Sequence, residues 1–319
     1  NTGETRWSTL FFTDIDGSYE LTNWCIIETE NQIFISYADL RNSTPYIRYH
    51  LASFDFYGTS LFNNIIYTGD ATEQEDHQHS LYWKNNKFYF YSLIEVWTDS
   101  WSYKAKILCL NPTGAIQWSG SYTLGVSNDI FSSFAIDSTH IYFMWENKAN
   151  HNLYLHKVDI TNGDVVAPFP ILIGAYGLWW GQQLGYDDTN IYFSNYNILF
   201  QVNKATGVIS QINNLLEKDI FTFCLMDLNN IYSIGTSFNP IYNSYFKQYN
   251  KNTAVLSNLA FPPYAGEVFS YPLTYWCTMN MKNPVLFVDT VRKSLFILIS
   301  NNYGGTVIYN QPTSLYEIK

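Results

Sequence analysis

Four aspartates at repeated positions are the side chains of this sequence best suited to hold a metal ion. They are Asp137, Asp187, Asp227 and Asp289. Carboxylate oxygens are the ligands that Ca²⁺ prefers, so four of them around one mouth of a channel would form a calcium site. Turn formation is the alternative, because an aspartate side chain readily bonds nearby backbone N–H groups. The sequence predicts a cation site at these positions and indicates no other cofactor.

A second cluster, at residues 73–79, combines acidic residues with two histidines. His77 and His79 would point to the same face of a strand, an arrangement that suits a transition metal. We interpret the segment as a solvated acidic turn, because no other histidine is close to it in the sequence. The sequence contains no Gly-x-Ser-x-Gly, P-loop or His-Glu-x-x-His pattern, so it indicates no catalytic residue.

Aromatic residues outside the repeated segments are the candidate binding residues. They are Trp97, Trp101, Trp179, Trp180, Tyr264, Tyr271, Tyr275 and Trp276. Exposed tyrosine and tryptophan rings stack on sugars or anchor protein interfaces. For Trp179 and Trp180, a place in the core is the alternative. Long loops on a rigid scaffold often carry function, so we expect a protein or glycan partner to contact residues 257–283.

The composition limits the partners of this chain. Lysine and arginine number 17 against 27 acidic residues, and the formal net charge is −10 with no basic run. Nucleic acids and anionic membranes are bound through clustered cations, so we expect neither. No apolar run approaches the roughly 18 residues of a spanning helix, and we therefore expect no membrane insertion.

Three features favour an extracellular, cell-surface or secretory location. Lysine is scarce, the sequence starts with Asn1 instead of Met, and Asn42-Ser43-Thr44 is an acceptor for a glycan on Asn42. The four cysteines lack the paired spacing of a zinc site. The sequence leaves two alternatives for them, disulfides or buried free thiols. These cysteines are Cys25, Cys109, Cys224 and Cys277.

Two sequence signals recur in register and predict the elements that carry these residues. In the first, a polar turn leads into a Tyr- or Phe-bearing strand, most clearly at residues 137–143, 188–193 and 227–232, with weaker copies at 30–34, 85–89 and 292–296. In the second, a strand of alternating apolar and polar residues leads into a polar turn that ends at Gly58, Gly114, Gly163, Gly207 or Ala254. Glycine supplies the positive φ that such a hairpin needs. The spacing of roughly 44 to 56 residues is that of a four-stranded propeller blade.

The two ends of the sequence complement each other. Residues 314–319 match residues 153–158 and then stop before the turn, whereas residues 1–7 begin with that turn. We predict an all-β, six-bladed β-propeller formed by one domain, residues 1–319, in which the N-terminal strand closes the last blade. Trp7 and Tyr316 should then share a sheet. The insertion at residues 257–283 leaves a seven-bladed propeller as the alternative.

The turn residues resemble the quinoprotein-like (PQQ-type) propeller repeat. In that repeat an Asp/Asn-x-x-Thr-Gly turn leads toward a tryptophan, the position that Trp7 and Trp118 occupy here, while Val165 and Val208 stand there in other copies. The resemblance covers most of the chain and implies the propeller architecture alone.

These patterns favour a non-enzymatic protein- or glycan-binding or assembly module, which could form a homo-oligomer or a larger assembly. Two alternatives remain open. One is an enzyme with its site at the channel mouth, either a metal-assisted hydrolase or a quinone-dependent dehydrogenase, because a ring can draw one residue from each blade and leave no linear motif. The other is a structural subunit of a filament or coat.

Overall fold

All regular structure in the described part of the chain is β-strand, which confirms the predicted all-β class. The computed structural model describes residues 19–41, 47–98, 100–125, 133–147, 149–175, 184–195, 198–212, 219–226, 230–237, 243–259, 286–289, 294–300 and 313–318. Within these ranges no helix is long and apolar enough to cross a membrane.

The described strands form six antiparallel sheets. The first contains β1 (Tyr19–Glu28), β2 (Ile33–Arg41), β3 (Ile47–Phe54) and β4 (Ser60–Thr68). The second contains β5 (Glu73–Lys84), β6 (Lys87–Trp97), β7 (Trp101–Leu110) and β8 (Ile116–Gly125). The third contains β9 (Ser133–Ile136), β10 (His140–Asn147), β11 (Asn152–Asp159) and β12 (Ile171–Ala175).

The other three sheets follow in the same way. The fourth contains β13 (Gly185–Tyr186), β14 (Asn190–Asn195), β15 (Ile198–Asn203) and β16 (Ile209–Ile212). The fifth contains β17 (Asp219–Met226), β18 (Asn230–Ser237), β19 (Asn243–Asn250) and β20 (Val255–Leu259). The sixth contains β21 (Leu286–Asp289), β22 (Ser294–Ser300) and β23 (Thr313–Ile318).

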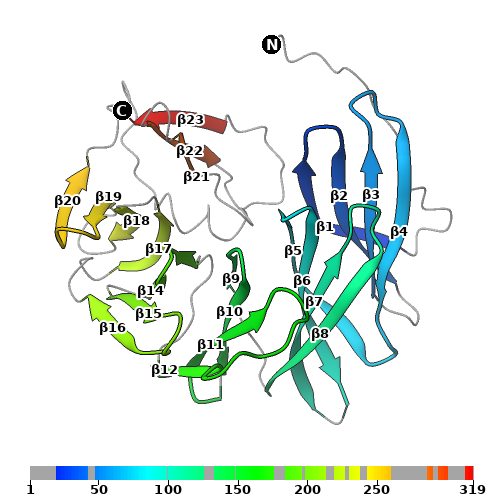
Figure 1. The fold of residues 1–319 in the computed structure, drawn as a ribbon, viewed down its shortest axis with the longest axis horizontal. Helices are drawn as coiled ribbons and strands as arrows, with labels where there is room; N and C mark the ends of the chain where they lie inside the picture. The colour runs from blue at the N-terminus through cyan, green and yellow to red at the C-terminus, as the bar shows by residue number, and fades with distance from the viewer. Residues whose placement is uncertain are drawn as a thin grey trace.

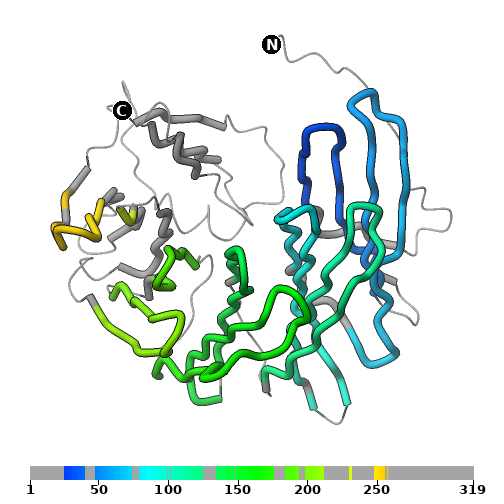
Figure 2. Tube along the Cα trace, viewed as in Figure 1, coloured from blue at the N-terminus to red at the C-terminus, as the bar shows by residue number. Residues whose placement is uncertain are grey.

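The arrangement of these sheets is propeller-like. Each sheet uses consecutive strands, and the sheets follow one another around a ring in chain order (Figure 1). The first strands of neighbouring sheets meet, since β1 lies against β5 and β13 lies against β17. The cyan trace of the second sheet and the green trace of the third sheet lie side by side (Figure 2).

Both repeated signals form the turns that the sequence predicts. Asp137 N donates to His140 O at 2.9 Å and closes the turn between β9 and β10, and Asp187 N bonds Asn190 O at 3.0 Å between β13 and β14. The second signal places a residue with positive φ at five equivalent turns. These residues are Gly58 (φ 84°), Gly114 (φ 80°), Gly163 (φ 79°), Gly207 (φ 70°) and Ala254 (φ 56°).

The predicted closure of the ring lies partly outside the described residues. Tyr316 pairs with Ile297 in the sixth sheet, as a blade requires, but residues 1–7 with Trp7 are outside the described ranges. Most of the 257–283 insertion is outside them too. Cys109 is buried as a thiol, and the thiol of Cys25 donates to His79 O at 3.5 Å.

Apolar side chains fill the junctions between neighbouring sheets. The first and second sheets bury Tyr49 against Phe90, the second and third bury Tyr91 beside Phe143, and the third and fourth bury Tyr142 beside Phe193. Tyr142 and Phe143 are adjacent on β10 and belong to different junctions, because successive side chains of a strand point to opposite faces. The second and third sheets are therefore each buried on both faces.

His156 on β11 is a neutral imidazole inside one of these junctions. Its side chain is 6% exposed and stacks on Phe143 with 4.6 Å between ring centroids. Neither ring nitrogen has a hydrogen-bond partner among the described residues. Burial lowers the pKa of His156 from 6.5 to about 4, because the charged form would lose its hydration.

We expect the free energy of unfolding to fall as the pH drops from 6.5 to about 4. In this window the unfolded chain binds a proton at His156 and the folded chain does not, so acid favours unfolding, by up to about 3 kcal/mol. Urea denaturation at several pH values measures how steeply the free energy of unfolding changes with pH. His156→Leu should make this dependence weaker between pH 6.5 and about 4. An unchanged dependence would contradict the role given to His156.

Ala254→Gly should stabilise the protein by up to about 1 kcal/mol. Ala254 holds a left-handed conformation that costs an L-residue about 1–2 kcal/mol, and the greater entropy of glycine in the unfolded chain offsets part of this gain. The matched variant Gly207→Ala should destabilise, since its added Cβ would also lie 3.1 Å from Pro168. Thermal denaturation measures the Tm of both variants. Shifts of Tm in the same direction would disprove this account.

Candidate functional site

Asp137 closes its own turn and also binds the neighbouring sheet. Its Oδ1 accepts hydrogen bonds from the backbone N–H groups of Thr139 and His140, both at 2.8 Å. Its Oδ2 accepts one from Tyr142 OH at 3.1 Å and one from Lys204 Nζ at 2.6 Å. Lys204 follows β15 in the fourth sheet, so this carboxylate joins the third sheet to the fourth.

The same arrangement repeats one sheet further on. Asp187 Oδ1 accepts from the backbone N–H groups of Thr189 and Asn190, and its Oδ2 accepts from Tyr192 OH at 2.9 Å. Lys251, in the turn after β19 of the fifth sheet, donates to Asp187 Oδ2 at 3.3 Å. The repeat shows that the aspartates pair with lysines across sheet boundaries.

Ionisation of Asp137 is strongly favoured in the folded protein. Burial alone would raise the pKa of its carboxyl, but the bond to Lys204 and the two backbone N–H groups outweigh burial, and the pKa lies well below its usual range. Lys157 lies in the same group and donates from Nζ to Lys204 O at 2.8 Å. Burial lowers the pKa of Lys157.

Tyr186 of β13 lies close to two ammonium groups. Lys204 Nζ lies 4.8 Å from the centroid of its ring, and Lys84 Nζ lies 5.6 Å from the same centroid. Lys84, the last residue of β5 in the second sheet, also donates to Tyr186 OH at 3.2 Å and to Ile136 O at 3.3 Å. Three sheets therefore contribute to one cluster, which we call the Tyr186 site: Lys84, Asp137, Tyr186 and Lys204.

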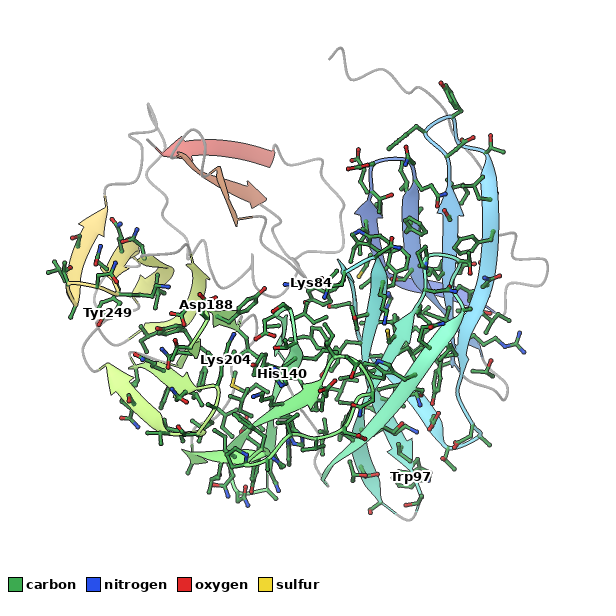
Figure 3. All side chains as sticks on the ribbon, in the orientation of Figure 1. Lys84, Trp97, His140, Asp188, Lys204 and Tyr249 are labelled. Carbon is green, nitrogen blue, oxygen red and sulfur yellow. The ribbon has the colours of Figure 1, made fainter. Side chains whose placement is uncertain are left out.

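The Tyr186 site is accessible and lies near the middle of the ring. The side chain of Tyr186 is 36% exposed. Figure 3 shows Lys84, His140, Asp188 and Lys204 in the central part of the molecule, whereas Trp97 lies far from them at the outer end of the second sheet. Within the described residues, the hydroxyl oxygen of Tyr186 accepts a bond and its hydroxyl hydrogen has no acceptor.

A phenol in this setting can act as a general acid. Tyrosine carries a proton at neutral pH and can donate it to a developing oxyanion. The phenolate left behind would be stabilised by two ammonium groups in a partly desolvated site. Lys84 is the ammonium of the pair that has no carboxylate partner among the described residues, so it could also attract an anionic group of a bound molecule.

The predicted metal site has no support in the described residues. Asp137 and Asp187 are each neutralised by a lysine, and the described part of the chain holds no group of three or more His, Cys, Asp or Glu side chains that could hold a metal. Asp289 ends β21 and Asp227 lies outside the described ranges. The cation site therefore stays a prediction.

The structure places two of the predicted aromatic residues. Trp97 ends β6, is 45% exposed and pairs through its backbone with Trp101 at the start of β7. The other candidates lie outside the described residues, as does the predicted glycan acceptor. They are Trp179, Trp180, Tyr264, Tyr271, Tyr275, Trp276 and Asn42.

The acidic segment at residues 73–79 belongs to a strand, contrary to the prediction of a solvated turn. Glu73 begins β5, is 2% exposed and pairs with Lys104. Its carboxylate also accepts a hydrogen bond from Tyr67 OH. His79 is buried beside Tyr49 with 5.4 Å between ring centroids, so this strand packs into the junction of the first two sheets.

Sequence reasoning missed Lys84, Tyr186 and Lys204. One signal could have found a member of the set, because Asn203-Lys204-Ala205-Thr206 and Asn250-Lys251-Asn252-Thr253 repeat a lysine at the same turn position. The repeat was interpreted only as a turn. Its lysines are the partners of the aspartates that were predicted to bind a cation.

No family model and no curated protein sequence matches this chain. One solved structure that it resembles is a chimera of ACO and RPE65, with a TM-score of 0.46 and 10% identity over 83% of this chain and 63% of that chain. A second is a mutant of the Synechocystis apocarotenoid oxygenase, with a TM-score of 0.47 and 10% identity over 83% of this chain and 64% of that chain. A third is a xylan β-1,4-xylosidase from Bacillus Halodurans C-125, with a TM-score of 0.38 and 13% identity over 79% of this chain and 59% of that chain. The chain thus spans less than two thirds of the length of these proteins.

The comparisons correct two expectations. The oxygenase and the xylosidase are enzymes by name, which contradicts the predicted non-enzymatic binding or assembly module. The quinoprotein-like resemblance is not supported either, since none of the proteins named above is a quinoprotein by name.

Removing Lys204 should leave Asp137 as an uncompensated buried charge. We expect Lys204→Met to lower the free energy of unfolding by about 3 kcal/mol and the double variant with Asp137→Asn to recover part of this loss. Lys251→Met is the matched control and should cost less, because Asp187 is more exposed than Asp137 and its ion pair is longer. Urea denaturation of the unmodified chain, Lys204→Met, Asp137→Asn and the double variant gives the coupling energy, and a coupling near zero would contradict the proposed role.

Proposed function

We propose that this chain is an enzyme whose reaction centre is the Tyr186 site, at one mouth of a six-bladed propeller. The proposed reaction is hydrolysis of a small ester that carries a carboxylate or phosphate. The observation that carries the proposal is the proximity of the Tyr186 phenol to two ammonium groups, those of Lys84 and Lys204.

Tyr186 would act as the general acid. When water attacks the ester, the bond to the leaving oxygen breaks and the phenol proton passes to that oxygen. The acid product keeps the water oxygen, and the proton that the attacking water loses passes to the solvent. The proton can be donated because the hydroxyl hydrogen has no acceptor among the described residues. Lys84 and Lys204 would then stabilise the phenolate until a proton returns from solvent.

The substrate's anionic group is inferred from the charge balance of the site. Lys204 is neutralised by Asp137 at 2.6 Å, whereas Lys84 bonds a carbonyl and a phenol, and no carboxylate of the described residues pairs with it. In a chain with a net charge of −10, an ammonium left without a counter-ion beside a proton donor favours a negatively charged substrate.

The blade count belongs to the same proposal. Six sheets in chain order within the described residues support six blades, with residues 1–7 supplying the fourth strand of the sixth sheet. In such a ring, the turns that begin the second strands of neighbouring blades surround one mouth of the channel. Lys84 and Asp137 lie at those turns, and Tyr186 immediately precedes the next one.

Tyr186→Phe should lower kcat by about 100-fold or more, since it keeps the ring and removes the proton. Phenyl phosphate and phenyl succinate are suitable probes, because their phenol leaving group gains from protonation, and chromatography measures the phenol released. Lys84→Met should mainly raise KM for both esters. Tyr57→Phe, at an 87% exposed turn residue, is the control and should leave both constants unchanged. Turnover that survives Tyr186→Phe would refute the assignment of the acid.

A further inference from the structure

The fourth sheet carries a shallow depression on the face opposite to Tyr186. It has a volume of about 340 Å³ and is lined by Asn190, Gln201, Asn203, Thr206, Val208 and Ser210. This volume falls within the range of small-molecule sites, about 300–1,000 Å³. We call these residues the blade 4 depression.

Strand register explains why the depression and the Tyr186 site are separate. Tyr192 pairs with Gln201, which pairs with Ser210, and Asn190 pairs with Asn203, so these side chains share one face of the sheet. Tyr186 pairs with Ile191 and lies on the other face, where the third sheet packs. A molecule in the depression would therefore not contact the phenol of Tyr186.

The chemistry of the lining is neutral and rich in hydrogen-bonding groups. All lining residues except Val208 carry an amide or a hydroxyl, and none is charged. The side chains of Gln201 and Ser210 make no hydrogen bond with another described residue, so their donors and acceptors are available to a ligand. Asp187 and Lys251, which lie next to Tyr192, pair with each other at 3.3 Å.

Tyr249 of β19 supplies an aromatic ring on the side of the fifth sheet. It pairs with Ile231, the counterpart of Ile191, so it occupies the position that Val202 has in the fourth sheet. Lys251, two residues after Tyr249, bonds Asp187 at 3.3 Å and lies 5.7 Å from the ring centroid of Tyr192, so this end of β19 lies next to the fourth sheet. Val202 is buried, whereas Tyr249 is partly exposed.

We propose that the blade 4 depression binds a neutral saccharide. Sugar hydroxyls both donate and accept hydrogen bonds, as the amides of Asn190 and Gln201 and the hydroxyl of Ser210 do. The apolar face of a sugar ring can pack on Tyr249, since an aromatic side chain offers a flat apolar surface beside a polar group. A charged ligand would find no counter-ion in the lining. This site is independent of the reaction proposed for Tyr186.

Saturation-transfer NMR on the full chain tests the proposal, with D-glucose, D-galactose, D-mannose, D-xylose and N-acetyl-D-glucosamine as probes. We expect transfer to at least one of them and weaker transfer to D-glucuronate. Tyr249→Ala and Gln201→Ala should each weaken binding about tenfold. Tyr57→Ala removes an exposed tyrosine elsewhere and should leave binding unchanged.

The outcomes separate this proposal from that for the Tyr186 site. Tyr186→Phe should lower kcat for the esters by about 100-fold or more and leave saccharide binding intact, because the two sites lie on opposite faces of the sheet. The saccharide site is overturned if none of the five neutral sugars shows transfer, or if binding persists unchanged in both Tyr249→Ala and Gln201→Ala. A Tm near that of the unmodified chain shows that each variant is folded.

Discussion

The carboxylate of Asp137 is the contact on which the described architecture most depends. The described strands of neighbouring sheets share no backbone ladder, so contacts made by side chains hold one sheet against the next. Apolar packing between them is strong but not directional. Asp137 adds direction, because one oxygen is fixed by the backbone N–H groups of its own turn and the other receives Lys204 from the next sheet at 2.6 Å.

The Tyr186 site follows from that contact. Lys204 is 9% exposed, and a buried ammonium needs a counter-ion as well as hydrogen bonds. Asp137 supplies the charge and so holds Lys204 Nζ 4.8 Å from the ring centroid of Tyr186. Lys84 reaches the same phenol from the second sheet. Lys204 is fixed by Asp137, and Lys84 has no carboxylate partner among the described residues, so the two ammonium groups give this tyrosine an environment suited to the proton donation that the proposed hydrolysis requires.

The sequence was sufficient to predict what depends on local chemistry. Turn residues determine hairpins within a few positions, so the turns at Asp137, Asp187 and Gly207 could be predicted together with the all-β class. Ion pairs across sheets could not be predicted, because Asp137 and Lys204 are 67 residues apart and their contact depends on how the sheets pack. Without those partners, the aspartates resembled cation ligands. The same limitation hid Tyr186, a single residue of the short strand β13.

Side chains alternate between the two faces of a strand, so the fourth sheet has two different surfaces. On the face toward the third sheet, Ile191 and Val202 are buried and Tyr186 meets two lysines. On the other face, Asn190, Gln201 and Ser210 form a neutral row. One sheet can therefore present a charged reaction centre and a neutral binding surface, and a substitution on one face leaves the hydrogen-bonding groups of the other in place.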